Sequence, residues 1–351
     1  MITFIEIEGF KCFFTKTVIA MSQITVCAGM NSVGKSTLVQ SLLLMKQSYK
    51  SKNKDILLNT DSLNLGSSRQ IMSGKMRLAT NNSFFEYVSE KDDLLLRKIN
   101  EKKGESSLSG TLYYLNAERI GPRNYHAMQN AKVSHCGYKG EHTFDVINRN
   151  KNALISAKRC YNNKTAQMKE LAFQINRWME YIANDVSVDF SSDEHTLLAN
   201  MKVRQPDMDT PFSSPHNFGF GISYVLPIIT TGLIAKENTI FIVENPEAHL
   251  HPAGQSRIGE FLAQVSCDNV QVVVETHSEH VINGIRKYAL KNKLTPDKIC
   301  LNYFAIDGEP KKHSVTRILL NENMDILSWP PGFFDQELND MKEIRELRKR
   351  L

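Results

Sequence analysis

The sequence predicts an α/β fold built on a parallel sheet, and three observations lead to that prediction. Residues 23–29, QITVCAG, have the pattern of a fully buried strand, and a glycine-rich loop and an amphipathic helix follow it directly. From Phe241 onward, apolar runs alternate with helical segments as far as residue 306. Alternation of this kind is typical of a parallel sheet covered by helices.

The first 120 residues predict the N-terminal part of this core together with an antiparallel β subdomain. Residues 2–10 alternate β-forming and polar residues, as a half-buried strand does, and the helix begins at about Ser36. The rest of this region is richer in Ser, Asn and Gly. Its runs at 83–88 and 110–115 predict short antiparallel strands.

Residues 121–235 predict a helical insertion, and residues 236–310 return to the strand and helix pattern of the core. The insertion contains one clear apolar face at helical spacing, formed by Leu171, Ile175, Trp178 and Ile182. The C-terminal element, 311–351, ends in a helix. Its apolar residues are predicted to share one stripe, which comprises Leu338, Met341, Ile344, Leu347 and Leu351.

Composition and charge exclude several classes of protein. Hydrophobic residues make up 41% of the 351 and charged residues 23%, which is the balance of a globular chain rather than a disordered one. The six cysteines form no C-x-x-C pair, so a reducing cytoplasm is the expected location. Because no run of 18 apolar residues exists, no membrane partner is expected. A net charge of +5 is too small to indicate nucleic-acid binding by itself, although DNA stays a possible partner.

A phosphate-binding loop is the strongest motif in the sequence. The run GMNSVGKST matches G-x-x-x-x-G-K-[ST] in full, with a buried strand before it and a helix after it. The alternative is a glycine-lysine turn that matches by chance. Backbone N–H groups of the loop would cradle the phosphates, Lys35 would reach the β and γ oxygens, and Ser36 would place its hydroxyl on Mg²⁺. The predicted nucleotide ligands are Gly29, Asn31, Ser32, Gly34, Lys35, Ser36 and Thr37.

Two further strand ends carry candidate site residues. Glu244 ends the apolar run IFIVE and is expected to bring an acid to Mg²⁺ from a strand beside the phosphate-loop strand. The alternative is a strand-end glutamate exposed to solvent. His277 follows the next buried run, VQVVVET, where a ring nitrogen would reach a γ-phosphate. A histidine satisfied by backbone groups is the alternative there.

A second anion site is predicted at the start of a later helix. The run NFGFGISYVLP places Gly219, Gly221 and Ser223 where a helix N-terminus would bind phosphate. A phosphate already held by its own loop would receive this second site from another subunit, so the pattern predicts a nucleotide-bridged dimer. The alternative is a plain glycine turn between two lobes.

Taken in order, GMNSVGKST, FGFGISYV, IFIVENPEAHLHP and VVVETHSEH resemble the ABC-type ATPase heads of the SMC, RecF and OLD group. The sequence is more similar to small bacterial AAA-family ATPases of that group, which carry E-N-P-E-x-H-L-H-P and a C-terminal G-F-F-D-Q, here at 332–336. LNAERIGPRNY at 115–125 also resembles a segment of these proteins. The resemblance implies a P-loop NTPase with an ABC-ATPase-like head that binds ATP and Mg²⁺ and forms a homodimer or higher homo-oligomer around nucleotide.

Residue roles follow from the resemblance, position by position. It implies that Lys35 and Ser36 belong to the Walker A loop, Gly219 to Ser223 to the signature region, Glu244 to the Walker B acid and His277 to the switch histidine. His249, Leu250 and His251 fall on the D-loop, which crosses to the partner in such dimers. A metal cluster of His249, His251, His277 and His280 is disfavoured, because no thiolate or regular ligand spacing accompanies them.

The sequence departs from the family pattern at two places. The signature region lacks the usual Leu-Ser-Gly-Gly-Gln string. Asn245 stands where ABC ATPases place the glutamate that polarises the attacking water. An amide orients water but does not accept its proton at neutral pH, so slow hydrolysis is predicted unless Glu247 takes over.

The resemblance implies an ATPase subunit that controls a separately encoded effector, a nuclease or a toxin, in bacterial anti-phage defence. The chain between Lys35 and Gly221 is too short for the long coiled coil of chromosome-organising relatives. Two alternatives stay open: a RecF-like clamp that holds DNA, and an ATP-bound scaffold that does not hydrolyse.

Overall fold

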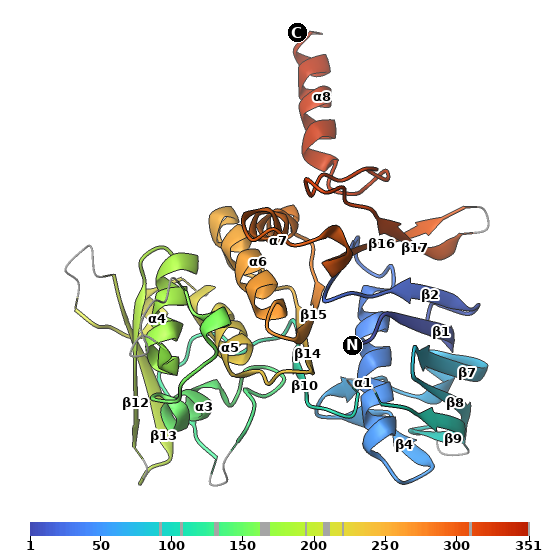
Figure 1. Ribbon diagram of the computed structural model, residues 1–351, viewed down its shortest axis with the longest axis horizontal. Helices are drawn as coiled ribbons and strands as arrows, with labels where there is room; N and C mark the ends of the chain where they lie inside the picture. Colours follow the sequence, from blue (N-terminus) through green and yellow to red (C-terminus); the bar gives the residue numbers. More distant parts are fainter. Residues whose placement is uncertain are drawn as a thin grey trace.

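The computed structural model describes most of the chain in one α/β architecture with an added antiparallel sheet and a lateral lobe (Figure 1). The described residues are 1–90, 93–105, 108–129, 133–161, 169–193, 195–205, 211–219, 221–308 and 311–349. Three parts are visible: a central sheet, the antiparallel sheet beside α1, and a lobe that carries α3, α4 and α5.

The central sheet has six strands in the order β10-β14-β15-β3-β16-β17. Five of them run in parallel, and β17 pairs antiparallel with β16 at the edge. The bounds are β3 Ile24–Gly29, β10 Leu112–Leu115, β14 Thr239–Glu244, β15 Val270–Glu275, β16 Ile299–Asp307 and β17 Lys312–Ile318. The residues of β15 are all buried, which agrees with the unbroken apolar runs expected of a sheet covered on both faces.

The antiparallel sheet lies against the helix that follows the phosphate loop. Its order is β2-β1-β7-β8-β9-β4. The bounds are β1 Phe4–Phe10, β2 Thr17–Ala20, β4 Asp55–Leu57, β7 Met72–Thr80, β8 Ser83–Ser89 and β9 Leu95–Lys103, with the small pair β5 Asn59–Thr60 and β6 Leu63–Asn64 beside them. The strand predicted at 83–88 is therefore confirmed. The strand predicted within 110–115 is also present, as β10, but its antiparallel pairing is wrong, because β10 pairs in parallel with β14 in the central sheet.

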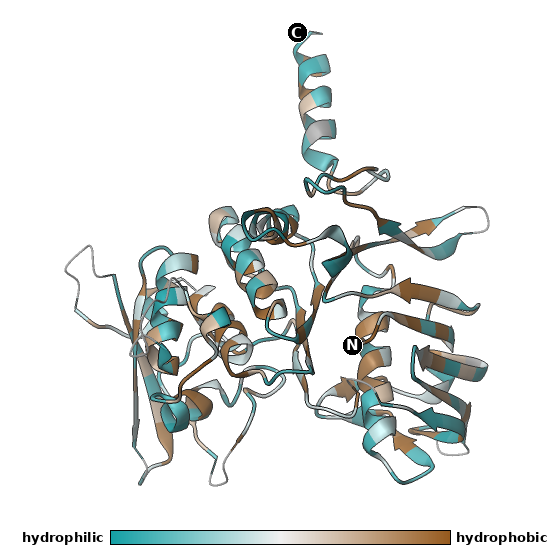
Figure 2. Cartoon of the chain, viewed as in Figure 1, coloured by the Kyte–Doolittle hydropathy of each residue, from teal (hydrophilic) through white to brown (hydrophobic). Residues whose placement is uncertain are grey.

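Helices cover both faces of the central sheet. α1 Lys35–Lys50 fills one face together with the antiparallel sheet, and α5, α6 and α7 cover the other. The remaining bounds are α2 Ser68–Ile71, α3 Thr143–Asn150, α4 Leu171–Ile182, α5 Gly221–Ile234, α6 Pro252–Ser266, α7 Glu279–Lys291 and α8 Gln336–Arg348. Figure 2 shows that hydrophobic residues concentrate on the central strands and on α1.

The lateral lobe is only partly what the sequence predicts. Its helix α4 buries the predicted face of Leu171, Ile175, Trp178 and Ile182 against α5 and α6. However, the lobe also contains a three-stranded antiparallel sheet in the order β11-β13-β12, which was not predicted. Its strands are β11 His126–Ala127, β12 Ser187–Asp193 and β13 Leu198–Arg204.

The C-terminal helix α8 stands apart from the rest of the molecule (Figure 1). Met341, Ile344 and Leu347 are exposed, so the predicted apolar stripe does not pack against the described part of this chain. Leu351 and the side chain of Leu338, the other two members of that stripe, lie outside the described residues.

Candidate functional site

The phosphate loop joins β3 to α1, and its conformation depends on two glycines. Gly29 has a φ of 142° and Gly34 a φ of 110°, both in the region that side chains disfavour. A Cβ on Gly29 would collide with the carbonyl oxygen of Phe304, and one on Gly34 would lie 2.8 Å from the Cys12 sulfur. Ser32 also has a positive φ, of 63°. The loop therefore wraps tightly ahead of the α1 N-terminus, as anion binding by backbone N–H groups requires.

Lys35 is buried at the first position of α1 and its ammonium folds back over the loop. Its Nζ donates to the carbonyl oxygens of Gly29, at 3.0 Å, and Met30, at 2.5 Å. Burial lowers the pKa of this lysine. The ammonium therefore lies beside the first residues of the loop, where it would meet the terminal phosphates of a nucleotide.

Ser36 contacts a carboxylate that the sequence analysis did not single out. Its Oγ donates to Oε1 of Glu275 at 3.0 Å. Glu275 ends β15, the strand that lies directly beside β3. Burial and the neighbouring charge of Glu244 raise the pKa of Glu275 to about 7. The signal for this residue was in the sequence, because VQVVVE is an apolar run that ends in an acid, as IFIVE is.

Glu244 does not occupy the place that the sequence predicts. The strand that carries it, β14, is separated from β3 by β15, so the expectation of a neighbouring strand is wrong. Both of its carboxylate oxygens accept hydrogen bonds, from the Tyr114 hydroxyl at 2.9 Å and from the Ala117 N–H at 3.1 Å. Glu244 and Glu275 are paired in register and therefore face the same side of the sheet. Burial raises the pKa of Glu244 as well.

Asn245 turns the chain immediately after the acidic strand. It has a φ of 44°, its N–H donates to the Glu275 carbonyl at 2.8 Å, and its carbonyl accepts from Arg119 at 2.6 Å. The side-chain oxygen is buried and has no hydrogen-bond partner among the described residues. An acceptor in that state is available to a bound water or ligand.

Arg119 is a second residue that the sequence analysis passed over, although the LNAERIGPRNY segment that contains it was noted. Its guanidinium is buried and donates to the backbone carbonyls of Asn116, Glu244 and Asn245 at 2.9, 2.6 and 2.6 Å. It also lies 5.8 Å from the ring centre of Tyr224 on α5. Arg119 therefore holds the end of β14 against the lateral lobe.

Glu247 and His277 are brought together by the fold. Glu247 accepts from the Thr276 hydroxyl at 2.7 Å and from the His277 N–H at 2.8 Å. Burial and the charge of Lys35 lower the pKa of His277, and its ring interacts with the backbone of Gly29. His277 thus lies at the phosphate loop, on a turn that Glu247 fixes.

A cavity of about 270 Å³ opens between these residues and the C-terminal element. Gly29, Met30 and His277 line one side of it. Tyr303 and residues 332–336, the GFFDQ element, line the other. The GFFDQ element therefore lies across this cavity from the start of the phosphate loop.

The residues predicted to form a signature region lie at the N-terminus of α5 and contact the residues predicted to form a D-loop. Gly221 begins the helix, and a Cβ there would lie 2.5 Å from the carbonyl oxygen of His249. The rings of Tyr224 and His249 lie 4.5 Å apart. Phe220 is outside the described residues. Within the described chain, no hydrogen bond joins Gly219, Gly221 or Ser223 to the phosphate loop.

The donors around Ser36 fit a magnesium ion bound together with a nucleotide. Oε2 of Glu275 is buried and has no hydrogen-bond partner in the described structure, and the Ser36 hydroxyl lies next to the same carboxylate. Mg²⁺ takes one or two protein oxygens, phosphate oxygens and water rather than a full protein cage. No group of three or more His, Cys, Asp or Glu that could hold a metal ion occurs in the described ranges.

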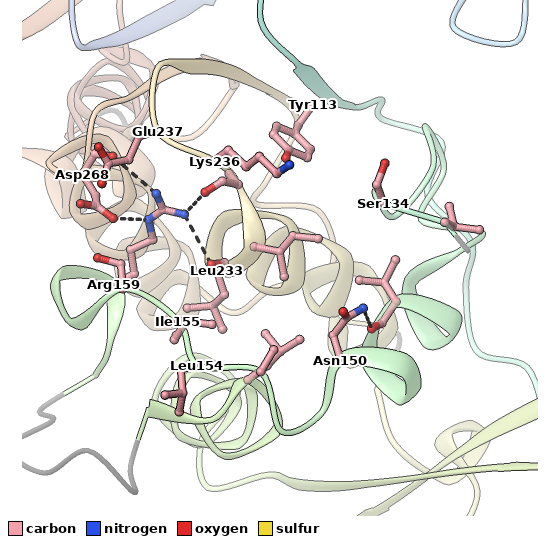
Figure 3. Close-up of a pocket in the computed structure, with 17 residues that line it drawn as sticks. Tyr113, Ser134, Asn150, Leu154, Ile155, Arg159, Leu233, Lys236, Glu237 and Asp268 are labelled. Atoms are coloured by element: carbon pink, nitrogen blue, oxygen red, sulfur yellow. Dashed lines mark hydrogen bonds and ion pairs between the residues drawn. The ribbon is translucent and has the colours of Figure 1, made fainter. Parts of the chain in front are cut away.

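A separate cavity of about 450 Å³ lies in the lateral lobe and does not include these residues (Figure 3). Arg159 lies at its edge, pairs with Asp268 at 2.9 Å and donates to carbonyls at the C-terminal end of α5. These contacts account for the buried charge as a structural ion pair.

Across the described segments, no helix combines the length and apolar character needed to span a membrane.

Comparison with known proteins agrees with this architecture. The chain is similar over 92% of its length to an SMC head that was crystallised bound to the C-winged helix domain of ScpA; the match covers 99% of that chain at 12% identity, with a TM-score of 0.50. SMC heads from Pyrococcus furiosus and Thermotoga maritima also match, both at 11% identity. Their TM-scores are 0.49 and 0.44, and the matches cover 98% and 91% of this chain and 99% of each of theirs. The first likeness shows a shared fold.

Family models divide the chain into two parts. Residues 294–344 match a family described as a protein of unknown function, DUF3696, and residues 1–282 match the family described as an AAA ATPase domain. No curated protein matches the sequence. Because the larger match covers more than half of the chain and includes the phosphate loop, both acidic strand ends and His277, the chain belongs to the family of AAA ATPase domains.

Proposed function

We propose that the protein is an ATPase subunit that binds MgATP, forms a homodimer around the nucleotides and thereby switches a separately encoded effector. The observation that carries the nucleotide part is the loop geometry: a buried ammonium and a serine hydroxyl stand at the N-terminus of α1. When bound, Mg²⁺ supplies charge neutralisation and orientation of the terminal phosphate. The protein contributes Lys35, Ser36 and the backbone N–H groups of the loop.

Slow hydrolysis is part of this proposal, and Asn245 is its cause. Among the described residues no donor contacts the buried Oδ1 of Asn245, so this oxygen would accept a hydrogen bond from the attacking water. An amide orients that water without removing its proton, and general base catalysis contributes about 10²–10⁴-fold in rate. We therefore expect a binding-driven switch with low turnover.

Glu247 serves as a positioning residue rather than as the base. Each of its carboxylate oxygens already accepts a hydrogen bond from the turn that carries His277. These two bonds hold the histidine beside Gly29, where its ring would contact the terminal phosphate. The carboxylate thus acts through the switch histidine.

The dimer part of the proposal is supported by the contact between the signature region and the D-loop. Gly221 packs against the His249 carbonyl, and Tyr224 packs against the His249 ring, so the two segments form one continuous surface. The α5 N-terminus on this surface would meet the phosphate held by the loop of a second copy.

Control of an effector in anti-phage defence is proposed from the resemblance to defence ATPases. A phage-plating assay tests it, with cells that carry the gene, its genomic neighbour, or both. Protection that requires both genes and is lost in Lys35→Ala supports the proposal. Protection without the neighbour, or ATP-dependent and salt-sensitive DNA binding by the purified protein, would favour a RecF-like clamp instead.

The turnover experiment tests the ATPase itself. We expect Asn245→Glu to raise the hydrolysis rate by about tenfold or more, because it restores a proton acceptor. Lys35→Ala is expected to abolish nucleotide binding, and Glu247→Gln to bind ATP while turning over more slowly. Rates are measured by phosphate release and binding by calorimetry.

Two outcomes contradict this assignment. An unchanged rate in Asn245→Glu together with an inactive Glu247→Gln would make Glu247 the base. Recovery of bound ATP from the purified protein, with no hydrolysis above background, would indicate a scaffold. Circular dichroism of each variant checks that the added or removed charge has not unfolded the chain.

A further inference from the structure

We infer that Glu275, at the end of β15, is the carboxylate that contacts the magnesium ion of the bound nucleotide. Glu244 lies behind Glu275 and does not contact the ion directly. This inference rests on the proposed binding of MgATP. It assigns the metal to a residue on the strand beside the phosphate-loop strand, rather than to Glu244, the first acid of the ENPE motif.

The first step is position. β15 is the neighbour of β3 in the sheet, and Glu275 is paired in register with Cys27, two residues before Gly29. Its Oε1 accepts the proton of Ser36 at 3.0 Å. The serine of a phosphate loop is the protein hydroxyl that holds Mg²⁺. A carboxylate within hydrogen-bond distance of that hydroxyl is therefore near enough to share the ion or one of its waters.

The second step is the unused oxygen. Glu275 is 6% exposed, and its Oε2 has no hydrogen-bond partner within the described structure. Burying an unpaired carboxylate oxygen is unfavourable, and such atoms in folded proteins usually mark a bound water or ion. The orphaned oxygen lies on the same carboxylate that Ser36 contacts. A cation placed there would satisfy it.

The third step distinguishes the two glutamates. Both oxygens of Glu244 are occupied by Tyr114 and Ala117, whereas Glu275 keeps one free. Their side chains project from the same face of neighbouring strands, so a buried site holds two carboxylates. Like charges at this spacing repel, and a divalent cation relieves the repulsion. Glu275 is the residue with an oxygen available to do so.

Chemical fit points to Mg²⁺ rather than a softer metal. The available protein donors are a hydroxyl and a carboxylate, both hard oxygens, and Mg²⁺ commonly completes its octahedron with phosphate oxygens and waters. The Ser36 hydroxyl and the Glu275 carboxylate would hold the ion, and the ion would supply the positive charge that neutralises the terminal phosphates.

The experiment compares ATP binding with and without metal in two matched variants, Glu275→Gln and Glu244→Gln. Both keep side-chain volume and remove one negative charge. Binding of a fluorescent ATP analogue is titrated in EDTA and then at increasing free Mg²⁺. We expect Glu275→Gln to bind in EDTA as the parent does but to lose at least about tenfold of the affinity that Mg²⁺ adds. Glu244→Gln is expected to lose less.

A spectroscopic measurement tests the same inference without relying on ATP hydrolysis. Mn²⁺ replaces Mg²⁺, and its electron paramagnetic resonance signal reports how tightly the ion is held in the ternary complex with ATP. Weaker Mn²⁺ retention in Glu275→Gln than in Glu244→Gln supports the inference. Thermal unfolding of both variants confirms that each is folded at the temperature of measurement.

Three results would contradict the metal assignment or the proposed nucleotide binding, and they tell the two apart. Equal Mg²⁺ enhancement in Glu275→Gln and the parent would remove Glu275 from the metal site. An equal loss of affinity in EDTA and in Mg²⁺ would make Glu275 a structural partner of Ser36 only. Failure of the parent to bind ATP under either condition would sink the proposed function itself, which is a different outcome from these two.

Discussion

At the scale of single residues, burial lowers the pKa of a histidine that lies outside the nucleotide site. His126 in β11 stacks on Phe144 with ring centres 3.8 Å apart, inside the lateral lobe. Burial, together with the nearby charge of Arg123, lowers the pKa of His126 to about 4. The folded protein therefore favours the neutral imidazole, whereas the unfolded chain protonates it near pH 6.5.

This shift predicts acid sensitivity with a definite sign. A histidine whose folded pKa is depressed contributes stability above pH 6.5, and the contribution is lost as the pH falls toward 4. We expect His126→Phe, which keeps the stacked ring and does not titrate, to lose less thermal stability than the parent between pH 7.5 and pH 5. Melting by circular dichroism at both values measures the difference. Parallel losses in the two proteins would mean that folding does not lower the pKa of His126.

The residues of the nucleotide site show how far sequence patterns reach. Lys35 and Ser36 were predictable because their motif fixes both spacing and chemistry, and the structure places them at the start of α1. Glu275 was not recognised, since strand order decides which acid lies beside β3, and sequence gives only the order along the chain. Arg119 has no motif of its own; only the fold shows that its donors meet the carbonyls at the end of β14.

At the scale of elements, the sequence patterns predicted which segments form helices and buried strands better than they predicted which strands pair with one another. The predicted apolar face of α4 was confirmed, because helical periodicity depends only on residues that are close in sequence. The edge strand β10 was assigned to the wrong sheet, because a four-residue apolar run does not state whether its neighbour is parallel. Strands β12 and β13 were missed, since their residues are mostly polar on the exposed side and mimic loop composition.

The C-terminal element offers a prediction at this scale. Phe333 is 1% exposed and packs against Tyr303, Trp329 and Phe334, with ring centres 5.3, 5.3 and 4.8 Å away. Removing a buried phenylalanine ring costs about 3–5 kcal/mol, and here the loss falls on one local cluster. We expect Phe333→Ala to accelerate amide exchange in residues 329–348 while leaving β3 and β15 protected.

Hydrogen exchange read by mass spectrometry measures this effect. Leu327→Ala is the matched control, because Leu327 is 61% exposed and its truncation removes little packing. If both variants exchange as the parent does, the element is held by contacts other than the Phe333 cluster. If β3 also loses protection, the element and the core unfold together.

At the scale of the whole molecule, the central sheet separates two hydrophobic cores. One joins α1 to the antiparallel sheet, and the other joins α5, α6 and α7 to the lateral lobe. The phosphate loop belongs to the first side, and the start of α5 at Gly221 to the second. A nucleotide bridge between two copies would therefore connect the first core of one molecule to the second core of its partner.

Gly219 allows this bridge to be tested. Among the described residues other than its chain neighbours, no atom lies within 4 Å of a Cβ added at this position, so alanine fits there without collision. We expect Gly219→Asp to abolish the MgATP-dependent dimer, because its carboxylate repels the incoming phosphate, while Gly219→Ala dimerises as the parent does. Light scattering with and without MgATP measures the mass. A dimer that persists in Gly219→Asp, or forms without nucleotide, would place the interface elsewhere.

The guanidinium of Arg119 has a consequence for communication across the molecule. It is bonded to the backbone where β14 ends and lies against Tyr224 on the first turn of α5. A shift of α5 would therefore displace the turn that carries Asn245. Linkage is reciprocal: a partner that binds the lateral lobe and shifts α5 would change ATP affinity by the same factor by which ATP changes affinity for that partner. Arg119 is thus the residue at which an allosteric coupling energy between the lobe and the nucleotide would be measured.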